Sequence, residues 1–266
     1  MTVMNRPHYK SILVAAATVV LAILMIGCGG SGSSNQSDEA MPAPNPAAKP
    51  VDETTAGTVT GVVKFDGTPP PRKAINMSAV PNCAKLRDSP AMTEEVVPGD
   101  NGTLQNVVVY LDGDFSEYSF PRSSAPVMAD QKGCVYEPHV AALMTGESLQ
   151  VTSSDTATHN VNAMAKRNRS WNQTEPPGAA PITHQFAREE VAIRVACNVH
   201  PWMRMYIAVV GHPYFQVTGK DGSFSLKNVP PGTYTLTAWH ERYGTRKQTI
   251  TIQPKQEQTA TITFAQ

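Results

Sequence analysis

From residue 57 onward, hydrophobic and polar residues alternate in short runs that are separated by turns rich in glycine, proline and aspartate. Alternation with a period of two is typical of strands with one buried face, and no run shows a convincing 3.6-residue period. The pattern predicts an all-β protein, with its main strands at 58–65, 106–111, 146–152, 184–188, 191–196, 206–210, 215–218, 223–226, 233–239, 249–252 and 259–264. Three segments are predicted to be irregular: 72–102, 114–126 and 164–182.

The first 56 residues carry a different pattern. After a basic start, residues 11–26 are almost wholly apolar, which is short for a membrane-spanning helix and typical of the hydrophobic region of a signal peptide. Residues 28–56 are rich in Gly, Ser, Asn, Pro and Ala, so they cannot bury a core. We therefore expect a signal peptide at 1–27 and a flexible tether at 28–56.

The end of the apolar run adds a possible anchor. The stretch Met25-Ile26-Gly27-Cys28 resembles the lipobox of bacterial lipoproteins, with Met25 in the place of the usual leucine. The resemblance implies that Cys28 becomes the lipidated first residue of the mature chain, held at a membrane of the cell envelope on its periplasmic or outer side. A plain signal peptide or an uncleaved anchor is the alternative.

Charge excludes one class of partner. The chain carries 22 basic and 22 acidic residues, a formal net charge of zero, and no basic stripe follows the predicted strands. Nucleic-acid-binding domains usually show such a stripe. Nucleic acid is therefore not an expected partner.

The stretch Cys197-Asn198-Val199-His200-Pro201-Trp202-Met203 carries the candidate chemistry. Between two predicted strands it places a thiolate, an imidazole and a thioether, the ligand types of mononuclear electron-transfer copper sites. So tight a loop cannot supply a fourth ligand, and His159, which follows a predicted strand, offers a second imidazole. A cysteine or a methionine alone is more often a core residue. Together, His159, Cys197, His200 and Met203 predict a site for one copper ion.

Residues 127–211 resemble the cupredoxin family. The resemblance rests on 146–151, on His159-Asn160-Val161 and on the C-x2-H-x2-M loop, which with its proline after the histidine is most similar to that of amicyanin. It implies a Greek-key β-barrel or sandwich with copper near one end and the same four ligands.

Three neighbours of the predicted ligands have expected roles. Asn160 is a candidate for tying the two ligand loops together. Val199 stands where amicyanin has a proline, so its N–H is free to donate to the cysteine sulfur and raise the reduction potential. His200 is expected near the surface beside Trp202, which would then offer an aromatic docking patch to a redox protein partner.

The C-terminal part has a different pattern of strand and turn residues. Its D-G-x-F-x-L and V-P-P-G-x-Y-x-L runs, at 221–226 and 229–236, resemble the carboxypeptidase regulatory-like (transthyretin-like) β-sandwich. The opening strands that this family usually has match 57–63 and 106–111. We therefore predict one sandwich made of 57–126 and 212–266, with the cupredoxin-like domain at 127–211 inserted in it or adjacent to it.

The cysteines can be assigned by elimination. If Cys28 takes lipid and Cys197 takes metal, Cys83 and Cys134 remain, and in an oxidising envelope compartment they are a candidate disulfide.

These patterns favour a lipid-anchored blue copper protein that carries single electrons. One alternative is a periplasmic protein for copper binding and delivery. Another is a scaffold or adhesion lipoprotein whose regulatory-like sandwich binds a partner. An enzyme is not expected, because four protein ligands leave no open position for a substrate.

Overall fold

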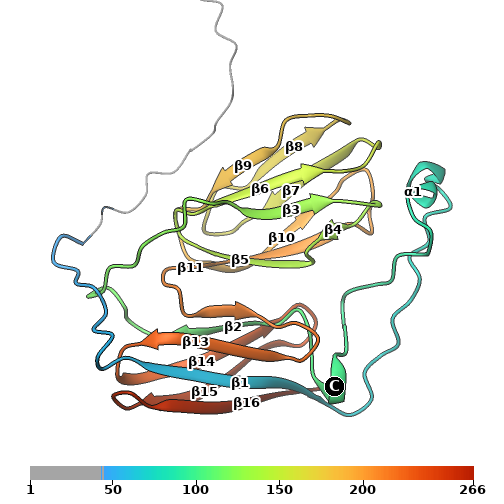
Figure 1. Cartoon of the computed structure of the whole chain (residues 1–266). Helices are drawn as coiled ribbons and strands as arrows, with labels where there is room; N and C mark the ends of the chain where they lie inside the picture. Colours follow the sequence, from blue (N-terminus) through green and yellow to red (C-terminus); the bar gives the residue numbers. More distant parts are fainter. Residues whose placement is uncertain (1–42, 44) are drawn as a thin grey trace, which may run out of the picture. The chain divides into compact units, whose positions relative to one another are not determined.

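The computed structural model describes residue 43 and residues 45–266, which belong to one compact unit. The predicted signal peptide, Cys28 and most of the tether lie outside these residues. The described part is nearly all β-structure in four sheets, which confirms the predicted all-β class (Figure 1). None of its helices has the length and apolar character needed to cross a membrane.

Two sheets enclose one apolar core and form what we call the first sandwich. Its three-stranded sheet runs in the order β13 (Ser223–Val229), β1 (Gly57–Asp66) and β16 (Glu257–Ala265). Its four-stranded sheet runs in the order β12 (Phe215–Val217), β2 (Val108–Asp112), β14 (Gly232–His240) and β15 (Gly244–Ile252).

The other two sheets form the second sandwich around a separate core. Its five-stranded sheet runs in the order β5 (Val140–Met144), β11 (Arg204–Val210), β10 (Glu190–Ala196), β7 (His159–Met164) and β8 (Trp171–Glu175). Its four-stranded sheet runs in the order β4 (Tyr136–Glu137), β3 (Val127–Gln131), β6 (Ser148–Ser153) and β9 (Ile182–Gln185).

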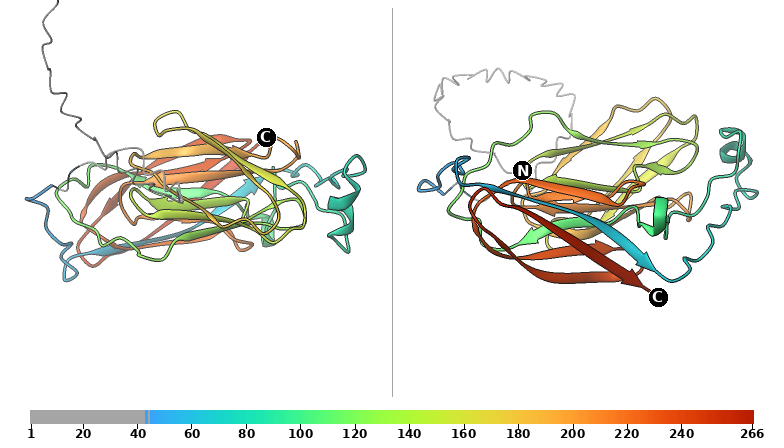
Figure 2. Two further views of the ribbon diagram at one scale, coloured as in Figure 1. Left: turned by 90° about the horizontal axis from the view of Figure 1, so that it is seen from above. Right: turned by 60° about the horizontal axis from the view of Figure 1, so that its bottom comes forward.

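The first sandwich is discontinuous in sequence. Strand β1 pairs in parallel with β16, the last strand of the chain, over nine residues, and Figure 2 shows the two side by side. Strand β2 pairs with β14. All strands of the second sandwich come from the chain between β2 and β12. The exact domain boundaries proposed from the sequence stay a prediction.

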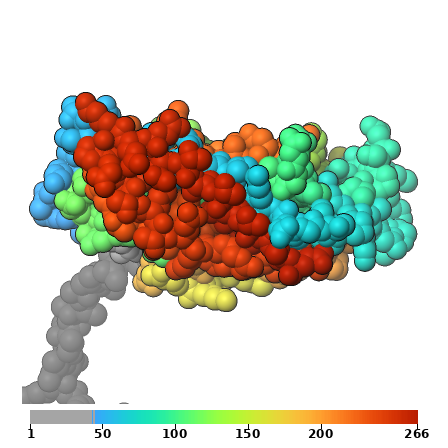
Figure 3. Space-filling view, turned by 90° about the horizontal axis from the view of Figure 1, so that it is seen from below, coloured from blue at the N-terminus to red at the C-terminus, as the bar shows by residue number. Residues whose placement is uncertain are grey.

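A long connection links β1 to β2, and we call residues 67–107 the arm. It contains the five-residue helix α1 (Pro81–Lys85) and the 3₁₀ turn η1 (Asp100–Gly102) and is otherwise irregular. The arm leaves the first sandwich, carries α1 to one end of the second sandwich and returns (Figure 1). In the space-filling view of Figure 3 it protrudes, in cyan and teal, at one end of the molecule.

Strands β3, β4, β5 and β7 are missing from the predicted set. Two further strands, β8 and β15, differ from the prediction for a reason that burial explains. Strand β8 lies in a segment predicted to be irregular, and β15 begins at Gly244 rather than near Thr249. Both occupy the edge of a sheet, and most of their residues are exposed. Because neither face of these residues is buried, the apolar alternation that reveals a strand is missing.

Candidate metal centre

Three of the four predicted ligands converge at one end of the second sandwich. His159, Cys197 and His200 each offer a ligand atom, and these atoms lie within 4.8 Å of one another. The Nδ1 atoms of the two histidines are 3.1 Å apart, and the Cys197 Sγ lies 3.5 Å from the Nδ1 of His200. All three residues are buried.

The backbone explains why these residues meet. Strand β7 begins at His159, and β10 ends one residue before Cys197; the two strands are antiparallel neighbours, with Ala196 opposite Asn162. Across the loop, the N–H of Cys197 donates to the carbonyl of Met203 at 3.2 Å, and the N–H of Met203 donates to the carbonyl of His200 at 2.9 Å. The loop is therefore a closed turn that folds Cys197, His200 and the buried Met203 back over the core.

Two asparagines link the His159 strand to the loop. The side-chain oxygen of Asn160 accepts from the N–H of Asn198 at 3.3 Å, and its amide nitrogen donates to Asn172 at 2.7 Å. A second link joins Asn162 to the Asn198 side chain at 3.1 Å. Asn160 thus lies where a residue tying the two ligand segments would have to lie.

Asp155 fixes the orientation of the His159 ring. Its carboxylate lies 2.9 Å from the Nε2 of His159 and also accepts the backbone N–H groups of Gly133 and Cys134 at 2.6 and 2.8 Å. Gly133 and Cys134 both have positive φ, of 60° and 55°, and in this turn both of their N–H groups point at the Asp155 carboxylate. Since Asp155 occupies Nε2, the Nδ1 of His159 is the atom left to face the cluster.

The charges of the cluster suit a metal ion. Burial lowers the pKa of His159, but hydrogen bonds to Asp155 and Cys197 outweigh burial and raise the pKa to about 9. Burial raises the pKa of the Cys197 thiol, but the hydrogen bond from His159 and nearby backbone N–H groups, that of Val199 among them, bring the pKa below its ordinary value. Burial and the neighbouring charge of His159 lower the pKa of His200. These shifts favour the deprotonated form of Cys197 and the protonated form of His159 in the metal-free cluster.

One expectation about the loop is wrong. His200 was predicted near the surface, but only 1 % of it is exposed. Trp202 is half-buried: its ring centroid lies 5.4 Å from that of His200, and its Nε1 donates to the carbonyl of Cys134 at 2.9 Å. The large hydrophobic residue that the loop exposes is Val199, at 50 %. The role of Trp202 in docking stays a prediction.

The predicted disulfide is confirmed: Cys83 and Cys134 are bonded, with their Cα atoms 5.6 Å apart. Cys83 belongs to α1 in the arm, and Cys134 precedes β4. The disulfide is buried, and its sulfur atoms lie within 4.8 Å of a ring nitrogen of His200. Cys197 is the free cysteine among the residues that the structure describes.

Asp155 and the arm are what sequence reasoning missed. An acidic residue four positions before the first histidine ligand was a usable signal for Asp155. Nothing local indicated that the arm would lie against the ligand loop.

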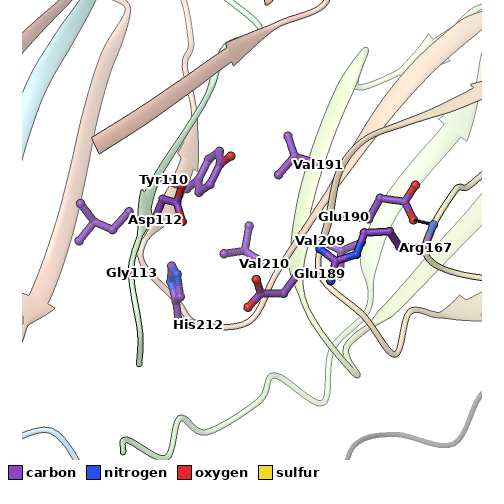
Figure 4. A pocket seen from close by; sticks show the side chains of 11 residues that line it. Tyr110, Asp112, Gly113, Arg167, Glu189, Glu190, Val191, Val209, Val210 and His212 are labelled. Atoms are coloured by element: carbon purple, nitrogen blue, oxygen red, sulfur yellow. Dashed lines mark hydrogen bonds between the residues drawn. The ribbon is translucent and has the colours of Figure 1, made fainter. Parts of the chain in front are cut away.

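A pocket lies apart from this cluster. Figure 4 shows it between the end of β2, with Tyr110 and Asp112, and residues of β10 and β11 such as Val191 and Val210. None of the four predicted ligands lines it.

The residues present fit a copper ion. Two imidazoles and a thiolate with ligand atoms in mutual reach, and a buried thioether from the same loop, are the donor set of a mononuclear electron-transfer copper site. The carboxylate behind His159 adds the second hydrogen bond that metal-bound histidines usually make.

Comparison with known proteins gives a family match for the end of the chain. A family model described as a carboxypeptidase regulatory-like domain matches residues 205–265, which confirms the resemblance predicted for the C-terminal part. The match starts within β11 of the second sandwich. Among curated proteins, none matches this chain.

Cupredoxins occur among the similar solved structures. A purple cupredoxin from Nitrosopumilus maritimus is 19 % identical, with 31 % of this chain and 98 % of that chain covered and a TM-score of 0.27. The Cu(I) form of an amicyanin mutant is 19 % identical, with 33 % and 84 % covered and a TM-score of 0.29.

A copper-containing nitrite reductase from Thermus scotoductus SA-01 is 15 % identical, with 37 % of this chain covered and a TM-score of 0.30. The similar part spans only 25 % of the reductase. At these scores the likenesses carry no argument about the metal or the activity of this chain.

Proposed function

We propose that this protein binds one copper ion at His159, Cys197, His200 and Met203 and carries single electrons. The observation that carries the proposal is the convergence of two imidazole nitrogens and the only described free thiol in a buried cluster. Copper bound there would supply a one-electron couple between Cu(II) and Cu(I), and a set of two imidazoles, a thiolate and a weak thioether suits both oxidation states.

The protein's own contribution is to hold these groups in one arrangement. Asp155 sets the ring of His159, Asn160 joins its strand to the loop, and the closed turn fixes His200 relative to Cys197. Ligands that are already placed before an electron arrives need to move little when it does. A carrier, rather than an enzyme, is expected if the four proposed protein ligands fill every coordination position of the copper ion.

The test is a titration of the metal-free full chain, solubilised in detergent, with Cu(II). We expect one equivalent to bind with an intense visible thiolate-to-copper band, and we expect Cys197→Ser to lose that band. The matched control is His184→Gln, which changes a histidine outside the cluster and should keep the colour.

Two other outcomes would count against the carrier. A protein that binds Cu(I) through the same residues and stays colourless with Cu(II) would instead be a delivery protein. A band that shifts strongly on addition of azide would reveal an open coordination position and favour an enzyme.

We also propose that the carrier is tethered in the cell envelope by lipid on Cys28 and meets a redox protein there. The Gly27-Cys28 pair after an apolar run supports this. Mass spectrometry of the mature chain should find residue 28 at the N-terminus with a lipid mass attached, and Cys28→Ser should lose both the lipid mass and the cleavage before residue 28. A mature N-terminus elsewhere, without lipid, would contradict the anchor.

A further inference from the structure

The arm completes the core that surrounds the ligand cluster. Met77, Cys83 and Ala91, which all belong to the connection between β1 and β2 of the first sandwich, are buried in the same apolar cluster as Cys197 and Met203. Further arm residues, Ile75, Val80 and Leu86, pack against it. The metal end of the second sandwich is thus not closed by its own strands alone.

Polar contacts hold the arm in the same place. The guanidinium of Arg87, two residues beyond α1, donates to the carbonyl of Lys132 at 3.3 Å and approaches that of Gly133 at 3.5 Å. On the return of the arm, the Glu94 carboxylate lies 3.8 Å from the Nδ1 of His139. Both polar contacts follow Cys83 in the chain, whereas Met77 and Ile75 pack against the core before it, so the arm is bound to the second sandwich on both sides of the disulfide.

The disulfide joins the arm to both ligand segments. Cys134 donates its N–H to Asp155, which holds His159, and its carbonyl accepts from Trp202 of the ligand loop. The disulfide bond to Cys83 fastens the arm to this junction. One residue, Cys134, therefore connects the arm, the first histidine and the loop of the second histidine.

This arrangement accounts for the burial of His200. A histidine in a short loop at the end of a sandwich is ordinarily open to solvent unless another segment covers it. Here both sulfur atoms of the disulfide lie within 4.8 Å of a ring nitrogen of His200, and the residue is 1 % exposed. The cover next to His200 is the disulfide and the arm segment that carries Cys83.

We propose that the arm is a strap, locked by the Cys83–Cys134 disulfide, that closes the ligand cluster to solvent and to small ligands. The first sandwich thereby controls access to a site that lies wholly in the second. For the carrier proposed above, on which this purpose rests, the strap would let electrons pass while excluding anions and thiols that exchange with metal ligands. A partner would then meet the arm and Val199 rather than the edge of His200.

The experiment needs no metal, so it can fail independently of the proposed function. Metal-free full chain is treated with iodoacetamide, and the alkylation of Cys197 is followed by mass spectrometry of the peptide that contains it. With the strap in place we expect slow alkylation, since the thiol reacts only when the cluster opens. In Cys83→Ala/Cys134→Ala we expect the rate to rise by about a hundredfold.

Loss of global stability must be separated from loss of the strap. The matched control is Leu236→Ala, which creates a cavity in the core of the first sandwich and leaves the arm and disulfide in place. This variant should keep Cys197 protected at low denaturant. If the disulfide variant does not fold, Met77→Ala/Leu86→Ala loosens the arm with its disulfide intact, and alkylation should rise by about tenfold.

Three results would overturn the strap. One is rapid alkylation of the unaltered protein. Another is an unchanged rate in the arm variants. The third is an equal rise in Leu236→Ala, because opening would then follow global unfolding.

Discussion

Replacing Glu190 by alanine is expected to destabilise the protein by about 2–4 kcal/mol at neutral pH. The Glu190 carboxylate accepts the backbone N–H groups of Lys166, Arg167 and Asn168 at 2.5, 2.9 and 2.9 Å, and the Asn168 side chain at 3.1 Å. It thereby holds the turn that joins β7, the strand of His159, to β8. Alanine would remove the acceptor of the three backbone N–H groups, whereas the Asn168 side chain would keep its bond to the carbonyl of Arg188.

The effect should depend on pH in a defined direction. Burial raises the pKa of Glu190, but hydrogen bonds from the turn outweigh it and bring the pKa below its ordinary value of 4.5. A carboxyl whose pKa is lower in the folded state stabilises the fold above its unfolded pKa, and this stabilisation is lost as the pH falls through the folded pKa. The difference between the wild type and Glu190→Ala should therefore be full at pH 7 and shrink below about pH 4.5.

Urea unfolding at a series of pH values measures this difference. Glu189→Ala is the matched control, because Glu189 is the exposed neighbour and should change the free energy of unfolding by about 0.5 kcal/mol or less. A loss that stays constant from pH 7 to pH 3 would show that Glu190 acts by packing rather than as a carboxylate.

The contrast between a buried strand and an edge strand explains why β1 could be predicted from the sequence and β8 could not. Strand β1 alternates Val59, Val63 and Phe65 in the core with more exposed neighbours, so its pattern reveals both its existence and its inner face. Strand β8, with Asn172, Gln173 and Thr174 exposed, shows no such alternation. Alternation of apolar and polar residues reflects the burial of one face of a strand. It can therefore predict a strand only where one face is buried.

The candidate site likewise has one part that could be predicted from the sequence and one part that could not. Cys197, His200 and Met203 could be proposed from spacing, because one short loop holds all three. The burial of His200 could not, because its cover includes Cys83, which lies more than one hundred residues earlier in the chain. Pairing Cys83 with Cys134 was open to elimination, but its position against the ligand loop is a product of tertiary packing.

Asp155 shows what joins these two levels. Its spacing to His159 is local, whereas its other partners, Gly133 and Cys134, come from the segment that the disulfide fastens to the arm. The Asp155 carboxylate is thus held by the segment that the disulfide joins to the arm, and it in turn orients a predicted ligand, His159. This makes Asp155 the residue at which a change outside the four ligands should affect metal binding most.

Asp155→Asn is expected to weaken copper binding by about 10- to 100-fold without unfolding the protein. The asparagine keeps one acceptor for the backbone N–H groups of Gly133 and Cys134 but loses the charge that makes the His159 ring a stronger base and fixes its Nδ1 toward the cluster. Competition for Cu(II) against a chelator of known affinity measures the loss, and circular dichroism checks the fold.

Asp130→Asn is the control that separates position from charge. Asp130 is also a hydrogen-bonded carboxylate of the second sandwich, but it accepts from Thr152 and Ser154 and has no bond to a predicted ligand. Its replacement should leave the affinity for copper unchanged. If Asp155→Asn also binds copper as tightly as the wild type, the orientation of His159 is set by packing alone. The contacts that join the arm to Asp155 through Cys134 would then have no effect on the affinity for copper.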